Sequence, residues 1–258
     1  MNARTFTAIG LASLLAFSCG FPKQVLADDS SNNSSREGFP GRRLGGGTRG
    51  DCLSTKEKSK RLTALVPANN LGVTVAGYPT LFFYVPSTST PATLEFVLQD
   101  ENESEIYEKT FTTPGTGGII KVSLPASATL PPLAVGKKYR WVFSMVCPTS
   151  RADDVVVDGG IERVTPEAAL AARLEKASPQ ERVALYASAD LWNEALVTLA
   201  ELRRTSPDDA AITAKWTKLL QSVGLDSIVR EPVLPEQIFQ EPVSKIQSGS
   251  ISSKTLER

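Results

Sequence analysis

The sequence predicts an α+β protein in which an N-terminal antiparallel β-sandwich precedes a small α-helical region. Two patterns carry this expectation. Residues 51–164 contain short, alternating apolar segments separated by Gly- and Pro-rich turns, as in β-sandwiches. Residues 165–229 instead show apolar side chains every three or four positions and several Ser/Thr-Pro pairs, which is typical of helices and their starts.

The N-terminus, residues 1–27, has the pattern of an export signal. Arg4 precedes an apolar run over residues 6–17, which is too short to span a bilayer. We expect cleavage between Ala27 and Asp28, and therefore a periplasmic or extracellular mature protein. The alternative is lipidation at Cys19, but the bulky Phe17 stands two positions before it, where acylation signals carry a small residue.

Residues 28–50 are rich in Ser, Gly and Asn, and residues 230–258 are polar and contain Pro. Such compositions bury too little apolar surface to offset the entropy lost on ordering. We expect a disordered leader and a disordered tail on either side of the folded domains.

Strands are expected wherever short β-branched or aromatic runs alternate with polar residues, at 62–67, 73–76, 80–86, 94–99, 105–112, 119–124, 138–147 and 154–164. A turn is expected at Asp158-Gly159-Gly160. Tyr139, Trp141 and Phe143 share one strand face, where burial in the core is favoured over a sugar-stacking platform. The sandwich is expected to be immunoglobulin-like, although Trp141 lies too close to the second cysteine for the immunoglobulin spacing.

Two cysteines, Cys52 and Cys147, remain after cleavage of the signal. In an oxidising compartment they predict a disulfide, which contributes about 4–5 kcal/mol in the chain-entropy model; two buried thiols are the alternative. The chain has no histidine, which excludes Ser-His-Asp catalysis and histidine-ligated metals. Carboxylate chemistry, Ser-Lys chemistry and calcium held by oxygen ligands stay open. We expect no catalytic residue, no metal ligand and no cofactor.

Charge also limits the function. The 28 basic residues fall to 26 when Arg4 and Lys23 leave with the signal, against 28 acidic ones, so a nucleic-acid ligand is not expected. No later apolar stretch is long enough for a transmembrane segment. Acidic clusters at 100–105 and 153–158 could serve as a calcium loop or a carboxylate pair, but solvated turns are favoured because the calcium-loop spacing is missing.

Helix starts are expected at Thr165-Pro166, Ser178-Pro179 and Ser206-Pro207, with Glu181 completing a capping box after Ser178. Asp190 is expected to cap a helix over 191–204, and a last helix is expected to run from about 208 to 223 and stop at Gly224. The region resembles a single tetratricopeptide repeat, and the matching residues are Tyr186, Ala195, Leu199, Leu202 and Pro207.

The chain as a whole resembles a cyanobacterial family known as domain of unknown function 928, over about residues 44–230. The matching motifs are Gly45-Gly46-Gly47-Thr48-Arg49-Gly50 with Cys52, Leu62–Pro67, Pro79–Val85 with Pro86, Tyr139-Arg140-Trp141 with Cys147, Val157-Asp158-Gly159, and Leu185-Tyr186-Ala187 through Ala200–Arg204. The resemblance implies an exported cyanobacterial protein and carries no activity with it.

These patterns favour a non-enzymatic envelope protein that acts as a protein-binding or adaptor module. The residues expected to contact its partner, an envelope protein, are Tyr186, Trp192, Arg203 and Arg204. A carbohydrate-binding module that takes polysaccharide and a carboxylate-dependent hydrolase are the two alternatives.

Overall fold

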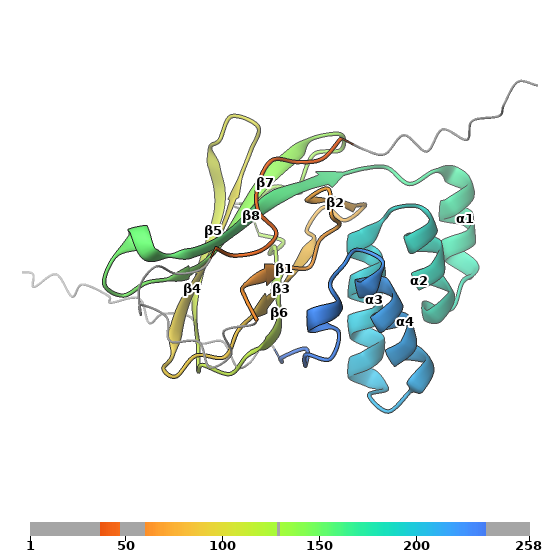
Figure 1. Ribbon diagram of the computed structural model, residues 1–258. Helices are drawn as coiled ribbons and strands as arrows, with labels where there is room; N and C mark the ends of the chain where they lie inside the picture. Colours follow the sequence, from red (N-terminus) through yellow and green to blue (C-terminus); the bar gives the residue numbers. More distant parts are fainter. Residues whose placement is uncertain (1–36, 47–59, 128–129, 236–258) are drawn as a thin grey trace, which may run out of the picture. The chain divides into compact units, whose positions relative to one another are not determined.

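The computed structural model describes residues 37–46, 60–127 and 130–235, which form a mixed α+β fold in three layers (Figure 1). A five-stranded sheet packs on a three-stranded sheet, and a helical layer that includes α2, α3 and α4 covers the other face of the three-stranded sheet. The described strands are β1 (Thr63–Ala64), β2 (Leu71–Thr74), β3 (Thr80–Val85), β4 (Ala92–Gln99), β5 (Glu105–Thr113), β6 (Gly118–Ser123), β7 (Lys138–Val146) and β8 (Val155–Arg163).

The strand order is β1-β3-β6 in the small sheet and β2-β8-β7-β4-β5 in the large one. Neighbouring strands are antiparallel except β2, which runs parallel to β8 from Leu71, opposite Gly160, to Thr74, opposite Arg163. The expectation of a purely antiparallel sandwich is therefore wrong at this edge. β1 and β2 lie in different sheets, so their connection crosses between sheets and does not make a hairpin.

The core between the two sheets is aromatic. Phe83 of β3 stacks on Phe143 of β7 with ring centroids 4.1 Å apart, and it meets the Trp141 ring edge-on at 5.4 Å. Trp141 and Phe143 are fully buried, while Tyr139 is partly buried and packs against the same core. The expected core position of this stripe is confirmed, and burying each ring contributes a few kcal/mol. Trp141 and Phe143 offer no surface on which a sugar could stack.

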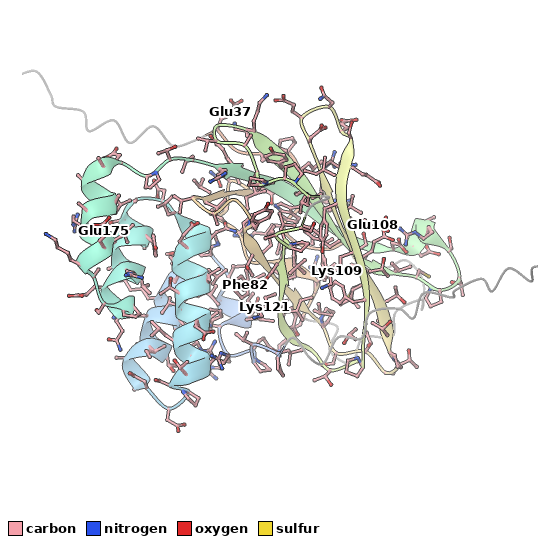
Figure 2. The ribbon with its side chains drawn as sticks, turned by 180° about the vertical axis from the view of Figure 1, so that it is seen from behind. Glu37, Phe82, Glu108, Lys109, Lys121 and Glu175 are labelled. Atoms are coloured by element: carbon pink, nitrogen blue, oxygen red, sulfur yellow. The ribbon has the colours of Figure 1, made fainter. Side chains whose placement is uncertain are left out.

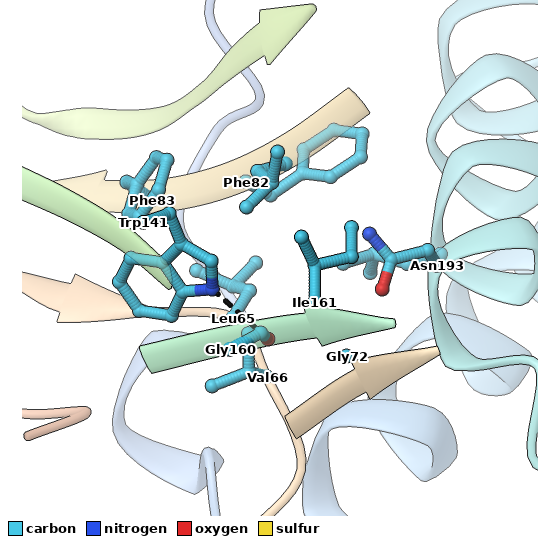
Figure 3. A pocket seen from close by; sticks show the side chains of 11 residues that line it. Leu65, Val66, Gly72, Phe82, Phe83, Trp141, Gly160, Ile161 and Asn193 are labelled. Atoms are coloured by element: carbon cyan, nitrogen blue, oxygen red, sulfur yellow. Dashed lines mark hydrogen bonds between the residues drawn. The ribbon is translucent and has the colours of Figure 1, made fainter. Parts of the chain in front are cut away.

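The turn expected at Asp158-Gly159-Gly160 is wrong, because all three residues lie within β8. The glycines are needed there for space. A Cβ on Gly159 would stand 2.4 Å from the Trp141 ring, and one on Gly160 would stand 2.4 Å from the Phe39 ring. The Trp141 Nε1–H also donates to the Gly160 carbonyl at 3.1 Å (Figure 3).

The helices are α1 (Ala168–Lys176), α2 (Pro179–Ser188), α3 (Trp192–Thr205) and α4 (Ala210–Gln221), with short 3-10 helices η1 (Arg151–Asp153) and η2 (Asp226–Ile228). The capping box before α2 is confirmed: the Ser178 N–H donates to Glu181 Oε2 at 2.8 Å, and Ser178 Oγ accepts from the Glu181 N–H at 3.4 Å. α4 ends at Gln221, before the expected stop at Gly224, and a turn connects the helix to this glycine, whose φ is +72°.

Three expected helix starts differ in the structure. Thr165-Pro166 does not open α1, whose N-cap position holds Glu167 without a side-chain bond. The N-cap of α4 is Asp209 and not Ser206. The Asp209 carboxylate accepts from the N–H groups of Ala211 and Ile212, which have no partner within the first helical turn. Asp190 sits in the left-handed region at φ +55°, so Leu191 occupies the N-cap of α3.

The small sheet is buried on both faces. On β3, Leu81, Phe83 and Val85 face the large sheet, whereas Phe82 and Tyr84 belong to the cluster shared with the helices. Figure 2 labels Phe82 where the sheet meets the helices, and it places Glu175 of α1 away from the strands. The expectation that the helices pack on each other and on the sandwich is confirmed.

Two segments outside the named strands and helices, residues 37–46 and 230–235, pair with strands of the sandwich. Leu44 bridges to Thr63 of β1, and Val233 bridges to Ile119 of β6, so the two flanks cover opposite edges of the small sheet. Leu234 is only 7% exposed and joins the core. Disorder was expected over residues 28–50 and 230–258, but residues 37–46 and 230–235 are part of the fold. Each of these two segments supplies backbone hydrogen bonds or apolar contacts to the sandwich.

Candidate functional site

The candidate site is a pocket of about 240 Å³ between the sandwich and helices α2 and α3, here called the helix–sheet pocket. The strand side comes from the end of β2, the segment before β3 and the first residue of β3, and the helix side from one residue of α2 and the first half of α3. Its described lining residues are Thr74, Ala76, Tyr78, Pro79, Thr80, Tyr186, Asn193, Glu194, Val197 and Thr198.

Two side chains in the first turn of α3 fix this helix on the sheet. The Trp192 Nε1–H donates to the Leu65 carbonyl at 2.8 Å, and the Asn193 amide donates to the Thr80 carbonyl at 3.2 Å. The next residue in this turn is Glu194, which consequently meets the end of β2. An acidic residue in a first helical turn also interacts favourably with the helix dipole.

Among the described residues, Glu194 forms its side-chain hydrogen bonds through one carboxyl oxygen. Its Oε1 accepts from the Thr74 hydroxyl at 2.6 Å and from the Val75 N–H at 2.8 Å. Its Oε2 is buried and has no hydrogen-bond partner among the described residues. Desolvation by burial raises the pKa of Glu194, and the bonds from Thr74 and Val75 oppose that rise only in part.

Asn193 also has a buried acceptor without a partner, Oδ1, but it belongs to a different cavity. That oxygen lies over Gly72, where a Cβ would come within 2.7 Å of it. Figure 3 shows the amide beside Gly72 and Ile161, at a cavity of about 10 Å³. This volume is about that of one water, which would supply the missing donor. Glu194 Oε2 and Asn193 Oδ1 are thus both buried atoms with almost no accessible surface.

The structure separates the four residues that the sequence suggests for partner contact. Tyr186 lines the helix–sheet pocket. Trp192 is 7% exposed and holds α3 to the sheet, so no partner can reach most of its surface. Arg204 is exposed and forms an ion pair with Glu201 one turn earlier on the same helix.

Arg203 packs inside the helical region. Its guanidinium lies 4.6 Å from the centre of the Trp216 ring, and its buried Nη1 has no hydrogen-bond partner in the described part of the chain. Burial lowers the pKa of Arg203. This cation–π contact gives Arg203 a packing role between α3 and α4.

Both acidic clusters are held in structural contacts. Asp100 Oδ1 accepts from the Asn102 and Ser104 N–H groups at 2.8 and 3.0 Å within the β4–β5 turn, and these bonds lower its pKa. Asp158 accepts from the Arg42 N–H at 3.0 Å and from Arg140 Nη2 at 2.6 Å. In the described part of the chain, no group of three or more Asp, Glu, Cys or His side chains is arranged to hold a metal ion.

Other sequence predictions concern residues outside the described ranges. Cys147 is buried at the end of β7, and its N–H donates to Asp154 Oδ1 at 2.7 Å. Cys52, the lipidation candidate Cys19 and the cleavage position at Ala27 and Asp28 lie outside the described residues, so these predictions remain untested.

Glu194 was not singled out by the sequence pattern. A glutamate in a first helical turn is common and normally solvated. Only the approach of β2, more than a hundred residues earlier in the chain, makes it a half-buried pocket residue. Tyr186 was found because it occupies a repeat-motif position.

The architecture defines a sandwich protein with a helical layer fixed on its small sheet. Residues 44–233 match the model of the family described as Domain of Unknown Function (DUF928), and the chain belongs to this family. Comparison with curated proteins finds no match. Within the described ranges, every helix is too short or too polar to cross a membrane.

Proposed function

We propose that this protein is an exported, non-enzymatic binding protein of the cell envelope, which acts as an adaptor by holding a partner at the helix–sheet pocket. The observation that carries this proposal is a pocket of about 240 Å³ that is lined by residues of both layers. Concave sites lined by apolar and aromatic side chains with a few polar groups are where proteins usually bind their ligands.

A binding role fits this pocket better than hydrolysis. Carboxylate-dependent hydrolases use two carboxyl groups that flank the scissile bond. Glu194 is the single Asp or Glu among the described residues that line the pocket. Asp100 and Asp158 are occupied by the structural contacts described above.

The finer architecture is part of the same proposal. The sandwich is taken as immunoglobulin-like, with a disulfide between Cys52 and Cys147. The α2–α3 hairpin is taken as a tetratricopeptide-like unit, which is supported by the complete burial of Ala195 and Leu199 at two motif positions. Export through the residue 1–27 signal and a cyanobacterial source complete the proposal.

Blocking the pocket tests the proposed function. Val197 lines the pocket and is 37% exposed, so Val197→Trp should fill the pocket without disturbing the core. Val135 is 53% exposed and does not line the pocket, so Val135→Trp is a matched control.

The full chain and both variants are immobilised, incubated with envelope extract, and their bound proteins quantified by mass spectrometry. The proposal expects one stoichiometric partner on the wild type and on Val135→Trp, reduced at least about tenfold on Val197→Trp. Equal retention of every bound protein by all three chains would refute it.

A further inference from the structure

The first turn of α3 is joined to the sheets by three consecutive side chains, and only one of them can ionise. Trp192 and Asn193 hold the helix through neutral N–H donors. Glu194 instead accepts, and its Oε1 takes bonds from the Thr74 hydroxyl at 2.6 Å and the Val75 N–H at 2.8 Å. Glu194 therefore supplies the one contact of this turn whose charge can change.

The end of β2 depends on the same carboxyl group. The Thr74 hydroxyl donates to Glu194 and also accepts from the Ala76 N–H at 3.0 Å. With the bond from the Val75 N–H, this makes a group of three hydrogen bonds that converge on one carboxyl oxygen. Thr74 and Ala76 also line the strand side of the helix–sheet pocket. The contact that holds residues 74–76 on α3 therefore also fixes one wall of the pocket.

The Glu194 carboxyl is closed off from water without an opposite charge beside it. Its Oε2 has almost no accessible surface, and within the described part of the chain no basic side chain forms an ion pair with it. Arg163 of β8 donates through Nε to the Val75 carbonyl at 3.3 Å and through Nη1 to another backbone carbonyl at 2.6 Å. Tyr78, before β3, and Tyr186 of α2 bring phenols, which carry no positive charge. Burial thus favours the neutral carboxyl over the carboxylate.

We propose that Glu194 is a proton-controlled latch between α3 and the end of β2. Its neutral carboxyl holds residues 74–76 against the helix, and its ionisation releases them and loosens the strand-side wall of the helix–sheet pocket. The two states differ because a carboxylate must regain water, whereas the neutral acid can stay sealed. Trp192 and Asn193 keep α3 in place in both states, so the change is confined to the end of β2.

The position of the switch on the pH scale follows from the same burial. Desolvation raises the pKa of Glu194, which separates its titration from that of exposed carboxyl groups. The chain has no histidine, so no imidazole titrates in the range between pH 5 and 8. The latch is a property of the chain alone and goes beyond the proposed function.

The test follows amide hydrogen exchange of the Val75 and Ala76 N–H groups by NMR in the full chain from about pH 4 to 8, corrected for the intrinsic pH dependence of exchange. Glu194→Gln keeps an oxygen that can accept from Thr74 and Val75 but cannot ionise. Glu201→Gln removes an exposed carboxylate from the same helix and is the matched control. The carboxyl carbon signal of Glu194, assigned by its absence from Glu194→Gln, gives the protonation midpoint, and thermal unfolding verifies folding.

We expect the Glu194 carboxyl to titrate with a midpoint above its ordinary pKa of 4.5. As pH rises through that midpoint, the corrected exchange rates of the Val75 and Ala76 N–H groups should increase at least about tenfold in the wild type and in Glu201→Gln. They should stay constant in Glu194→Gln, and core amides of β4 and β7 should not change in any of the three chains.

A Glu194 midpoint at or below 4.5, or the same pH dependence of exchange in the wild type and Glu194→Gln, would overturn the latch. Equal acceleration of the core amides would also overturn it, because the whole fold would then be opening. These readouts need no partner, so a failure of the latch leaves the proposed function standing. That function is tested separately by the extract experiment with Val197→Trp.

Discussion

Replacing Trp192 with Phe should destabilise the whole protein, because this indole joins the helical layer to the small sheet. Phe is roughly 40 Å³ smaller, and the cavity left at this buried position costs about 1 kcal/mol. The Leu65 carbonyl loses its donor, the Trp192 Nε1–H, at a site that is 1% exposed, which costs about 1–3 kcal/mol. Together these effects amount to about 2–4 kcal/mol, a large part of a typical folding free energy.

Urea unfolding, followed by circular dichroism, measures this loss. The midpoint should fall for Trp192→Phe while the slope of free energy against urea stays the same, and the melting temperature should drop by roughly 4–16 °C. Arg204→Ala is the control, since Arg204 is exposed and pairs with the exposed Glu201, and its loss should change stability by less than about 0.5 kcal/mol. An unchanged midpoint for Trp192→Phe, accompanied by loss of partner binding, would show that Trp192 is a contact residue and not an anchor.

Three further outcomes are expected. Gly159→Ala forces a Cβ to within 2.4 Å of the Trp141 ring and should cost about 1–3 kcal/mol or prevent folding, as measured by urea unfolding. The control is Gly46→Ala, where the nearest atom to the added Cβ is Arg42 Nη1 at 3.9 Å. Burial raises the pKa of Glu194, so the folded state holds this proton more tightly than the unfolded state does. The free energy of unfolding of the wild type should therefore fall relative to that of Glu194→Gln as pH rises from about 4.5 through the raised pKa. Parallel curves of stability against pH from about 4 to 8 would contradict this. Cys147→Ser should lower stability by about 2–5 kcal/mol under oxidising conditions and much less with reductant, whereas equal losses in both would argue for two thiols.

Much of the fold could be predicted because local patterns agree with the tertiary structure. In β4, the alternation of Leu94, Phe96 and Leu98 with more polar neighbours matches three residues of zero exposure. The capping box at Ser178 likewise depends only on residues within one helical turn. Such signals need no knowledge of distant segments.

The errors arose where distant residues decide the local structure. Asp158-Gly159-Gly160 has the composition of a turn, but the rings of Trp141 and Phe39 lie close over the two glycines and exclude side chains there. Asn70 reaches the same strand, since its amide donates to the Asp158 carbonyl at 2.9 Å. Neither constraint is visible within the β8 segment.

The candidate site was less predictable than the fold. The sequence places Trp192 on the helical face expected to contact a partner, but the small sheet has a second apolar face, and Trp192 belongs to the cluster that covers it. The continuous apolar run of β3, Thr80–Val85, carried this information, since a strand that faces water on one side would alternate. The pocket at Glu194 follows from how α3 lies on that face.

The double-sided burial of the small sheet has a consequence for gene engineering and for evolution. An excised segment of residues 51–164 would lack α3 and α4, and would therefore present Phe82, Tyr84 and Ile119 to solvent as a sticky patch. It would also lack Leu44 and Val233, leaving open strand edges that template aggregation. The sandwich and the helices should therefore be expressed together, and exchanged between homologues only as one unit.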